Sequence, residues 1–140
     1  MVKKVISIGE ALIDFIPQQK GVALKDVEGF LRVPGGAPLN VAAAVAKLGG
    51  KAQMLTKLGV DGFGDAILEE VMPLGVDVSR VSRTNQANTA LAFVSLKEDG
   101  ERDFSFYRHP SADMLLGEEE ICEEDFMNGA ILHFCSVSLI

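Results

Sequence analysis

Glycines at both ends of an alanine-rich run, residues 35–50, constrain the fold more than any other stretch of the sequence. Gly35-Gly36 precede Pro38, and the run Val41–Leu48 is closed by Gly49. Glycine adopts backbone conformations that other residues avoid, and proline presets a helical φ in a first turn, where its missing N–H does no harm. The pattern predicts a helix that begins near Pro38 and ends at Gly49, with its free N–H groups directed at a small ligand. A glycine turn that opens a helix and binds nothing remains the alternative.

Length and composition exclude several classes of protein. The 140 residues suffice for one core, and 48% apolar with 24% charged residues is typical of a soluble globular protein. A formal charge of -7 argues against a nucleic-acid surface. No apolar run is long enough for a bilayer, and Met1–Gly9 has too short an apolar block for a signal peptide, so we expect a cytoplasmic protein without a membrane partner. Cys122 and Cys135 lack metal-site spacing, so we expect free thiols and no metal site in this chain.

Strand and helix signals alternate along the first half of the chain. Val5–Ile8 and Ala52–Gly59 are apolar runs typical of strands that are buried on both faces. The predicted helix lies between them, and a second helix is expected from about Gly62 to Met72. This order predicts an α/β fold with a parallel sheet and right-handed crossovers.

A single carboxylate interrupts the apolar run Ala11–Ile16. In such surroundings Asp14 loses hydration unless hydrogen-bond donors replace the water. The hydroxyl groups of a polyol would supply such donors, and so would a turn that Asp14 caps or a neighbouring lysine. Both interpretations remain open from spacing alone.

Antiparallel strands are predicted on both sides of this α/β unit. The polar segment Gln18–Leu31 predicts a flap, with short strands at 22–24 and 29–33. Ala90–Leu96 and Arg102–Arg108 flank an Asp-Gly pair and predict a hairpin. The two-residue period of the second strand places Phe104, Phe106 and Arg108 on one face. That face would cover a ligand or pack in a sheet, and an arginine beside apolar residues usually binds an anion.

Three separated blocks of the sequence resemble the ribokinase-like (PfkB) family of carbohydrate kinases, most closely its fructokinase branch. They are Gly9–Asp14, Gly35–Ala42 with Gly49 and Gly59 at their distances, and Phe106–Leu116. The resemblance covers the whole chain and implies a three-layer αβα domain with a mostly parallel sheet. It also implies a small antiparallel β-sheet lid, formed by residues 11–34 and 89–108 approximately. Because family members are roughly twice this long and the last ten residues read as an apolar strand, we expect residues 1–140 to be the N-terminal part of one incomplete domain.

The resemblance also implies roles for individual residues. Positions that match Asp14, Gly35, Gly36 and Asn40 hold sugar hydroxyls in the family, and positions such as Phe93, Phe106 and Arg108 line the pocket under the lid. Arg108 would in addition support charge near the reacting end of the sugar. No catalytic base is implied for this chain, because the family's Gly-Ala-Gly-Asp and Asn-x-x-Glu motifs do not occur in it. Gly62–Asp65 resembles the first of these motifs only superficially, so Asp65 is not assigned as the base.

The function implied by the resemblance is ATP-dependent phosphorylation of fructose at its 6-hydroxyl. ATP and Mg²⁺ are the implied cofactors, with K⁺ as a further candidate, and a small sugar is the implied partner. This chain would carry the sugar-binding half and would be inactive alone. The alternatives are a 2-keto-3-deoxygluconate or nucleoside kinase of the same family, and a non-catalytic sugar-binding module. A homodimer through the exposed strand edges of the lid is also expected.

Overall fold

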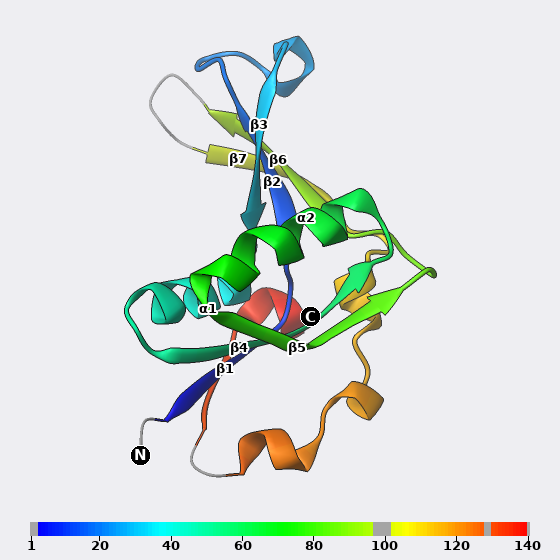
Figure 1. Ribbon diagram of the computed structural model, residues 1–140. Coiled ribbons are helices and arrows are strands. Elements are labelled where there is room, and N and C mark those ends of the chain that lie inside the picture. Colours follow the sequence, from blue (N-terminus) through cyan, green and yellow to red (C-terminus); the bar gives the residue numbers. More distant parts are fainter. Residues whose placement is uncertain (1–2, 97–101, 128–129, 140) are drawn as a thin grey trace.

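The computed structural model of the protein describes residues 3–96, 102–127 and 130–139, and these residues form two four-stranded sheets (Figure 1). The body sheet has the order β5-β4-β1-β8, and all its strand pairs are parallel. Its strands are β1 (Lys4–Ile8), β4 (Lys51–Gly59), β5 (Val76–Thr84) and β8 (Ile131–Phe134). The small sheet has the order β3-β2-β6-β7 and stands at one end of the body sheet. Its strands are β2 (Leu12–Pro17), β3 (Phe30–Gly35), β6 (Ala90–Leu96) and β7 (Arg102–Tyr107).

Two α-helices cover one face of the body sheet (Figure 1). They are α1 (Ala37–Lys47) and α2 (Gly62–Val71), and both lie close to their predicted bounds. Leu39 of α1 and Ile67 of α2 are buried in one cluster with Met54 and Leu58 of β4. The small alanines of α1 let its backbone approach the sheet, and Gly49 ends the helix at a φ of +82°, as the sequence predicts.

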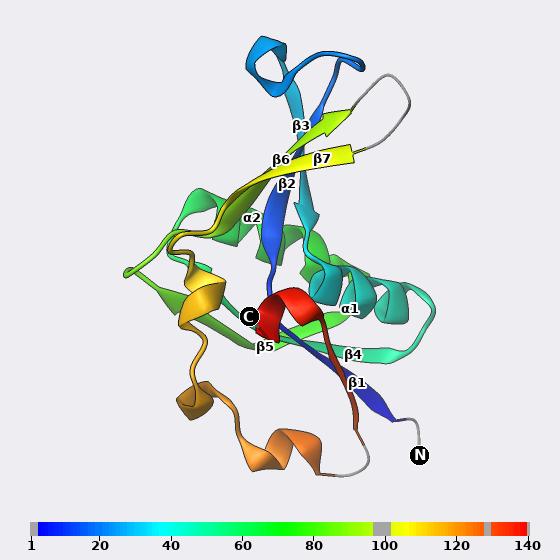
Figure 2. The same cartoon turned by 180° about the vertical axis from the view of Figure 1, so that it is seen from behind.

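The opposite face of the body sheet is crossed by residues 112–126, which form short 3₁₀ helices (Figure 2). Lys57 of β4 donates to the Leu115 carbonyl at 2.6 Å and forms an ion pair with Glu120 at 2.5 Å. Arg80 of β5 forms a second ion pair with Asp125 at 2.8 Å. The outer layer on this face is therefore an extended segment anchored by charges, and the described residues place no α-helix there.

Six short 3₁₀ helices connect these elements within the described residues. They are η1 (Leu24–Asp26), η2 (Met72–Leu74), η3 (Ala112–Leu115), η4 (Glu118–Glu120), η5 (Glu123–Phe126) and η6 (Ser136–Leu139).

The small sheet is mixed, because its central pair β2–β6 is parallel while β2–β3 and β6–β7 are antiparallel. The predicted hairpin between β6 and β7 is present, and its turn, residues 97–101, lies outside the described residues.

The strand predicted at 22–24 is wrong, because residues 24–26 form a 3₁₀ helix instead. Strand β5 was not predicted. Its alternation changes phase at a β-bulge opposite Gln53–Leu55, which hides the two-residue period.

Within the described part of the chain, no helix is long and apolar enough to cross a membrane. Cys122 and Cys135 are both free, as expected, and both are half-buried.

Candidate functional site

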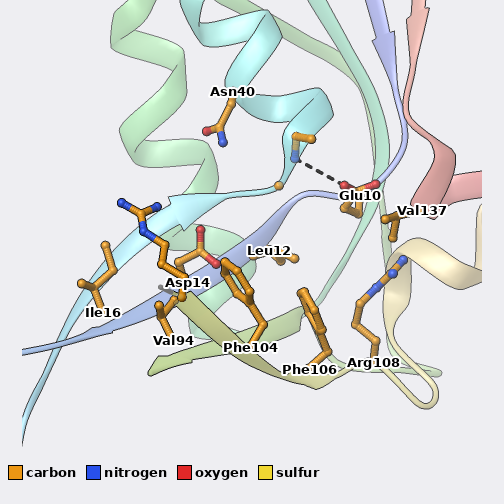
Figure 3. A pocket seen from close by; sticks show the side chains of 13 residues that line it. Glu10, Leu12, Asp14, Ile16, Asn40, Val94, Phe104, Phe106, Arg108 and Val137 are labelled. Atoms are coloured by element: carbon orange, nitrogen blue, oxygen red, sulfur yellow. Dashed lines mark hydrogen bonds between the residues drawn. The ribbon is translucent and has the colours of Figure 1, made fainter. Parts of the chain in front are cut away.

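A cavity of about 390 Å³ lies between the small sheet and the first turn of α1 (Figure 3). It opens beside the carboxyl ends of β1 and β8, the edge of a parallel sheet where ligands usually bind. Its volume lies in the range of small-molecule sites. The lining residues are Glu10, Leu12, Asp14, Ile16, Gly36, Ala37, Asn40, Val94, Arg102, Phe104, Phe106, Arg108 and Val137.

The first turn of α1 forms one wall, and its backbone is fixed by Gly36. This residue has a φ of +101°, and a Cβ there would lie 2.6 Å from the Glu10 carbonyl oxygen, so only glycine fits. Glu10 is 4% exposed, and its Oε1 accepts from the Ala37 N–H at 3.3 Å (Figure 3). Its Oε2 accepts from the Ser138 hydroxyl. Asn40, one turn into the helix, is exposed and lines the cavity.

Asp14 of β2 lies on the opposite wall, and its carboxylate accepts no hydrogen bond from the described residues. Gly35 lies so close to Asp14 that a Cβ at this position would overlap the Asp14 carboxyl group. Burial raises the pKa of Asp14, and the positive charge of Arg102 opposes this effect in part. Of the interpretations left open by the sequence, neither a capped turn nor a lysine partner is found among residues 3–96, 102–127 and 130–139. The carboxylate is available to hydroxyl donors in the cavity.

The raised pKa of Asp14 predicts the sign of a stability change. A carboxyl group whose pKa is raised by folding destabilises the folded state as the pH rises through that pKa. We therefore expect Asp14→Asn to raise the melting temperature at pH 7, and the gain to vanish as the pH falls below about 3.9, the ordinary value for aspartate. The measurement is thermal unfolding of the parent protein and of Asp14→Asn from pH 7 to below about pH 3.9. An equal difference at every pH would contradict the assigned cause.

Two aromatic rings form the floor of the cavity beneath Asp14. Phe104 and Phe106 of β7 stack with ring centroids 5.6 Å apart, and they are 45% and 54% exposed. Such exposure is unusual for phenylalanine and leaves apolar ring faces open to a ligand. Arg102 and Arg108 lie on the same strand face at the two ends of this pair, so the cavity combines apolar faces with positive charge.

The structure does not bring Phe93 to this cavity. In β6, Phe93 is paired with Phe15 and Ser105, and it therefore lies on the other face of the small sheet. Its ring stacks on Phe15 at 4.7 Å and contacts Tyr107 edge-on at 5.3 Å. The neighbouring Val94 lines the cavity instead, so the expectation for Phe93 is off by one strand position.

The other residues expected at the sugar site come together from distant parts of the sequence. Asp14, Gly36, Asn40, Phe106 and Arg108 all line the cavity, and Gly35 contacts Asp14 from behind.

Among the charged lining residues, the sequence analysis did not assign Glu10 and Arg102, and it placed Phe104 on the strand face of Phe106 without assigning it to the sugar site. Phe104 and Arg102 follow from the same two-residue alternation that identified Phe106, so this signal was present. Glu10 gave no comparable signal, because its hydrogen-bond partners Ala37 and Ser138 lie 27 and 128 positions away in the sequence.

At the glycine-rich start of α2, backbone N–H groups are already hydrogen-bonded to a side chain of the protein. The Asp61 carboxylate accepts from the backbone N–H groups of Phe63 and Gly64, and Asp65 forms an ion pair with Arg83 at 2.8 Å. These contacts give Asp65 a structural partner, Arg83. The described residues also contain no group of three or more His, Cys, Asp or Glu side chains that would hold a metal ion.

Comparison with known proteins gives one consistent family. The sequence pattern described as "pfkB family carbohydrate kinase" matches residues 2–140. The chain is 50% identical over 136 residues to a probable fructokinase-5 of Arabidopsis thaliana, covering 97% of this chain and 42% of that protein. It is 51% identical over 136 residues to fructokinase-1 of Zea mays, again covering 97% and 42%. The crystal structure of a fructokinase with bound ATP from Xylella fastidiosa matches with a TM-score of 0.85 and 44% identity, over 99% of this chain and 44% of that one. The chain thus spans about two fifths of the length of these relatives.

Proposed function

This chain belongs to the pfkB family of carbohydrate kinases, and we propose that it provides the sugar-binding half of a fructokinase. The reaction would transfer the γ-phosphoryl group of ATP to the 6-hydroxyl of fructose. The observation that carries this proposal is the carboxylate of Asp14, which has no hydrogen-bond partner in the described part of the chain and faces the first turn of α1 across a cavity with an aromatic floor. The similarity to fructokinases supports fructose as the sugar.

Residues of this chain would bind and orient the sugar. The Asp14 carboxylate and the Asn40 amide would each hold hydroxyl groups, while Gly35 leaves room for the Asp14 carboxyl group and the backbone of Gly36 borders the sugar. Phe104 and Phe106 would pack against its apolar face, and Arg108 would support negative charge at the reacting end. Closure of the small sheet as a lid would exclude water.

The catalytic base and the nucleotide site are proposed to lie beyond residue 140. ATP and Mg²⁺ are the proposed cofactors, with K⁺ as a further candidate. When bound, Mg²⁺ would neutralise charge on the transferring phosphoryl group. The described residues lack a suitable cluster of ligands, so none of them is assigned to the ion.

The protein is further proposed to form a homodimer through the small sheet. Its proposed location is the cytoplasm. The edge strands of the small sheet are β3 and β7, and unpaired strand edges favour association with a second copy.

An ADP-release assay with fructose tests the proposal, run on this 140-residue chain and on a version extended by the C-terminal part of a plant fructokinase. We expect turnover only from the extended version. Turnover by the short chain would contradict the proposal that the catalytic base and the nucleotide site lie beyond residue 140.

The alternative functions are separated by a wider panel of substrates. Turnover of 2-keto-3-deoxygluconate or of nucleosides would indicate a sibling kinase. Fructose binding without turnover in the extended protein would favour a non-catalytic module.

A further inference from the structure

Arg108 is held by a carboxylate that belongs to the body of the protein. Arg108 follows directly after β7 of the small sheet, and its Nη2 forms an ion pair with Oδ2 of Asp113 in η3. The side chains are 14% and 3% exposed, so both charges are largely removed from water. A buried charge is costly unless it is paired, and Asp113 supplies the negative charge here.

The position of Asp113 is fixed by further contacts. Its Oδ1 accepts from the Ser111 hydroxyl at 2.5 Å, and Ser111 is itself 1% exposed. The Ala112 N–H donates to the Asn88 carbonyl at 2.8 Å, and Lys57 of β4 donates to the Leu115 carbonyl at 2.6 Å. The carboxylate therefore sits on a segment that is attached to the β5–β6 connection on one side and to the body sheet on the other.

The Arg108 guanidinium lies in a wall shared by two cavities. One is the cavity that contains Asp14, and the other, of about 180 Å³, is bordered by Gly9, Asp113 and Ser138. Arg108 Nε is buried and has no hydrogen-bond partner among the described residues. Without Asp113 the side chain would keep no hydrogen bond or ion pair to the described residues, and its long aliphatic stem would let the charge move.

We propose that Asp113 is a positioning residue that holds the guanidinium of Arg108 against the sugar cavity. This inference rests on the proposed sugar-binding function. Asp113 does not line the cavity itself, so it acts on the sugar through Arg108, and Ser111 acts through Asp113.

A double-mutant cycle tests the proposal by fructose titration of the folded chain. We expect Asp113→Asn to weaken binding by about tenfold and Ser111→Ala by about threefold, equivalent to the loss of one charge-assisted contact or part of it. In an Arg108→Gln background, Asp113→Asn should change the dissociation constant by less than about twofold, because the group it positions is gone. An equal loss in both backgrounds, or no loss with Arg108 present, would overturn the proposal.

Asp125→Asn is the matched control, because Asp125 is 7% exposed and also pairs with an arginine, Arg80, but lies away from the cavity. It should lower the melting temperature and leave fructose affinity unchanged. The Arg108 Nε–H resonance gives a readout that needs no sugar. It should be sharp in the parent protein and broadened in Asp113→Asn, and an unchanged resonance would refute the positioning role. Failure of the parent protein to bind fructose would instead refute the proposed function, and with it the effect on sugar affinity.

Discussion

Replacement of Asp14 by asparagine is expected to weaken fructose binding by at least about 100-fold. A carboxylate that accepts from two sugar hydroxyls contributes about 1.5–3 kcal/mol for each charge-assisted hydrogen bond, and each 1.4 kcal/mol is about tenfold in affinity. An amide of the same shape keeps one weaker acceptor and adds a donor where hydroxyl donors are expected. The dissociation constant for fructose, from calorimetry or NMR titration, is the measurement.

Asp103→Asn is the matched control for this experiment. Asp103 lies on the same small sheet, in β7, but its position alternates with Phe104 and places it on the opposite face from the cavity. We expect this variant to bind fructose like the parent protein. Equal affinity of the Asp14 variant and the parent would contradict the sugar-binding role given to the Asp14 carboxylate.

Gly36→Ala is expected to reduce the free energy of unfolding by about 2–6 kcal/mol. The residue has a φ of +101°, where a side chain costs about 1–3 kcal/mol. The added Cβ would also lie 2.6 Å from the Glu10 carbonyl oxygen, and relief of such a backbone contact costs about 1–3 kcal/mol more. Urea unfolding of the variant and the parent measures the difference.

Gly49→Ala separates the two contributions at Gly36. Gly49 also has a positive φ, +82°, but a Cβ there would have no heavy atom within 4 Å. Only the cost of the left-handed backbone conformation remains, so we expect the free energy of unfolding to fall by about 1–2 kcal/mol. If both variants lost the same stability, close packing of the Gly36 backbone against Glu10 would not be the cause.

The sequence was most informative where local chemistry decides the structure. Proline and glycine at the ends of 37–49 determine where α1 begins and ends, and the apolar runs at 5–8 and 52–59 became central parallel strands. Asp14 was identified because a carboxylate in an apolar strand loses hydration and requires hydrogen-bond donors in its place. The structure places it opposite Asn40 on the wall of the cavity.

Sequence reasoning failed where the answer depends on register between strands. Alternation within β6 gives two faces, but only its pairing with β2 decides that Val94, and not Phe93, faces the cavity. The far face of the body sheet is likewise covered through contacts across long separations, such as Lys57 with Glu120. The pairing of Arg108 with Asp113 spans five residues, yet it requires the chain to turn back onto the body sheet.

Fructose titration of the isotope-labelled protein, followed residue by residue by NMR, shows whether the cavity beside Asp14 binds the sugar. We expect saturable shifts at the backbone amides of Gly35, Gly36 and Ala37 and at the side-chain amide of Asn40, with none at Gly49 or Gly75. These shifts should be lost in Asp14→Asn. Saturable shifts confined to residues away from the cavity, or none at all, would contradict the assignment of this cavity as a sugar site.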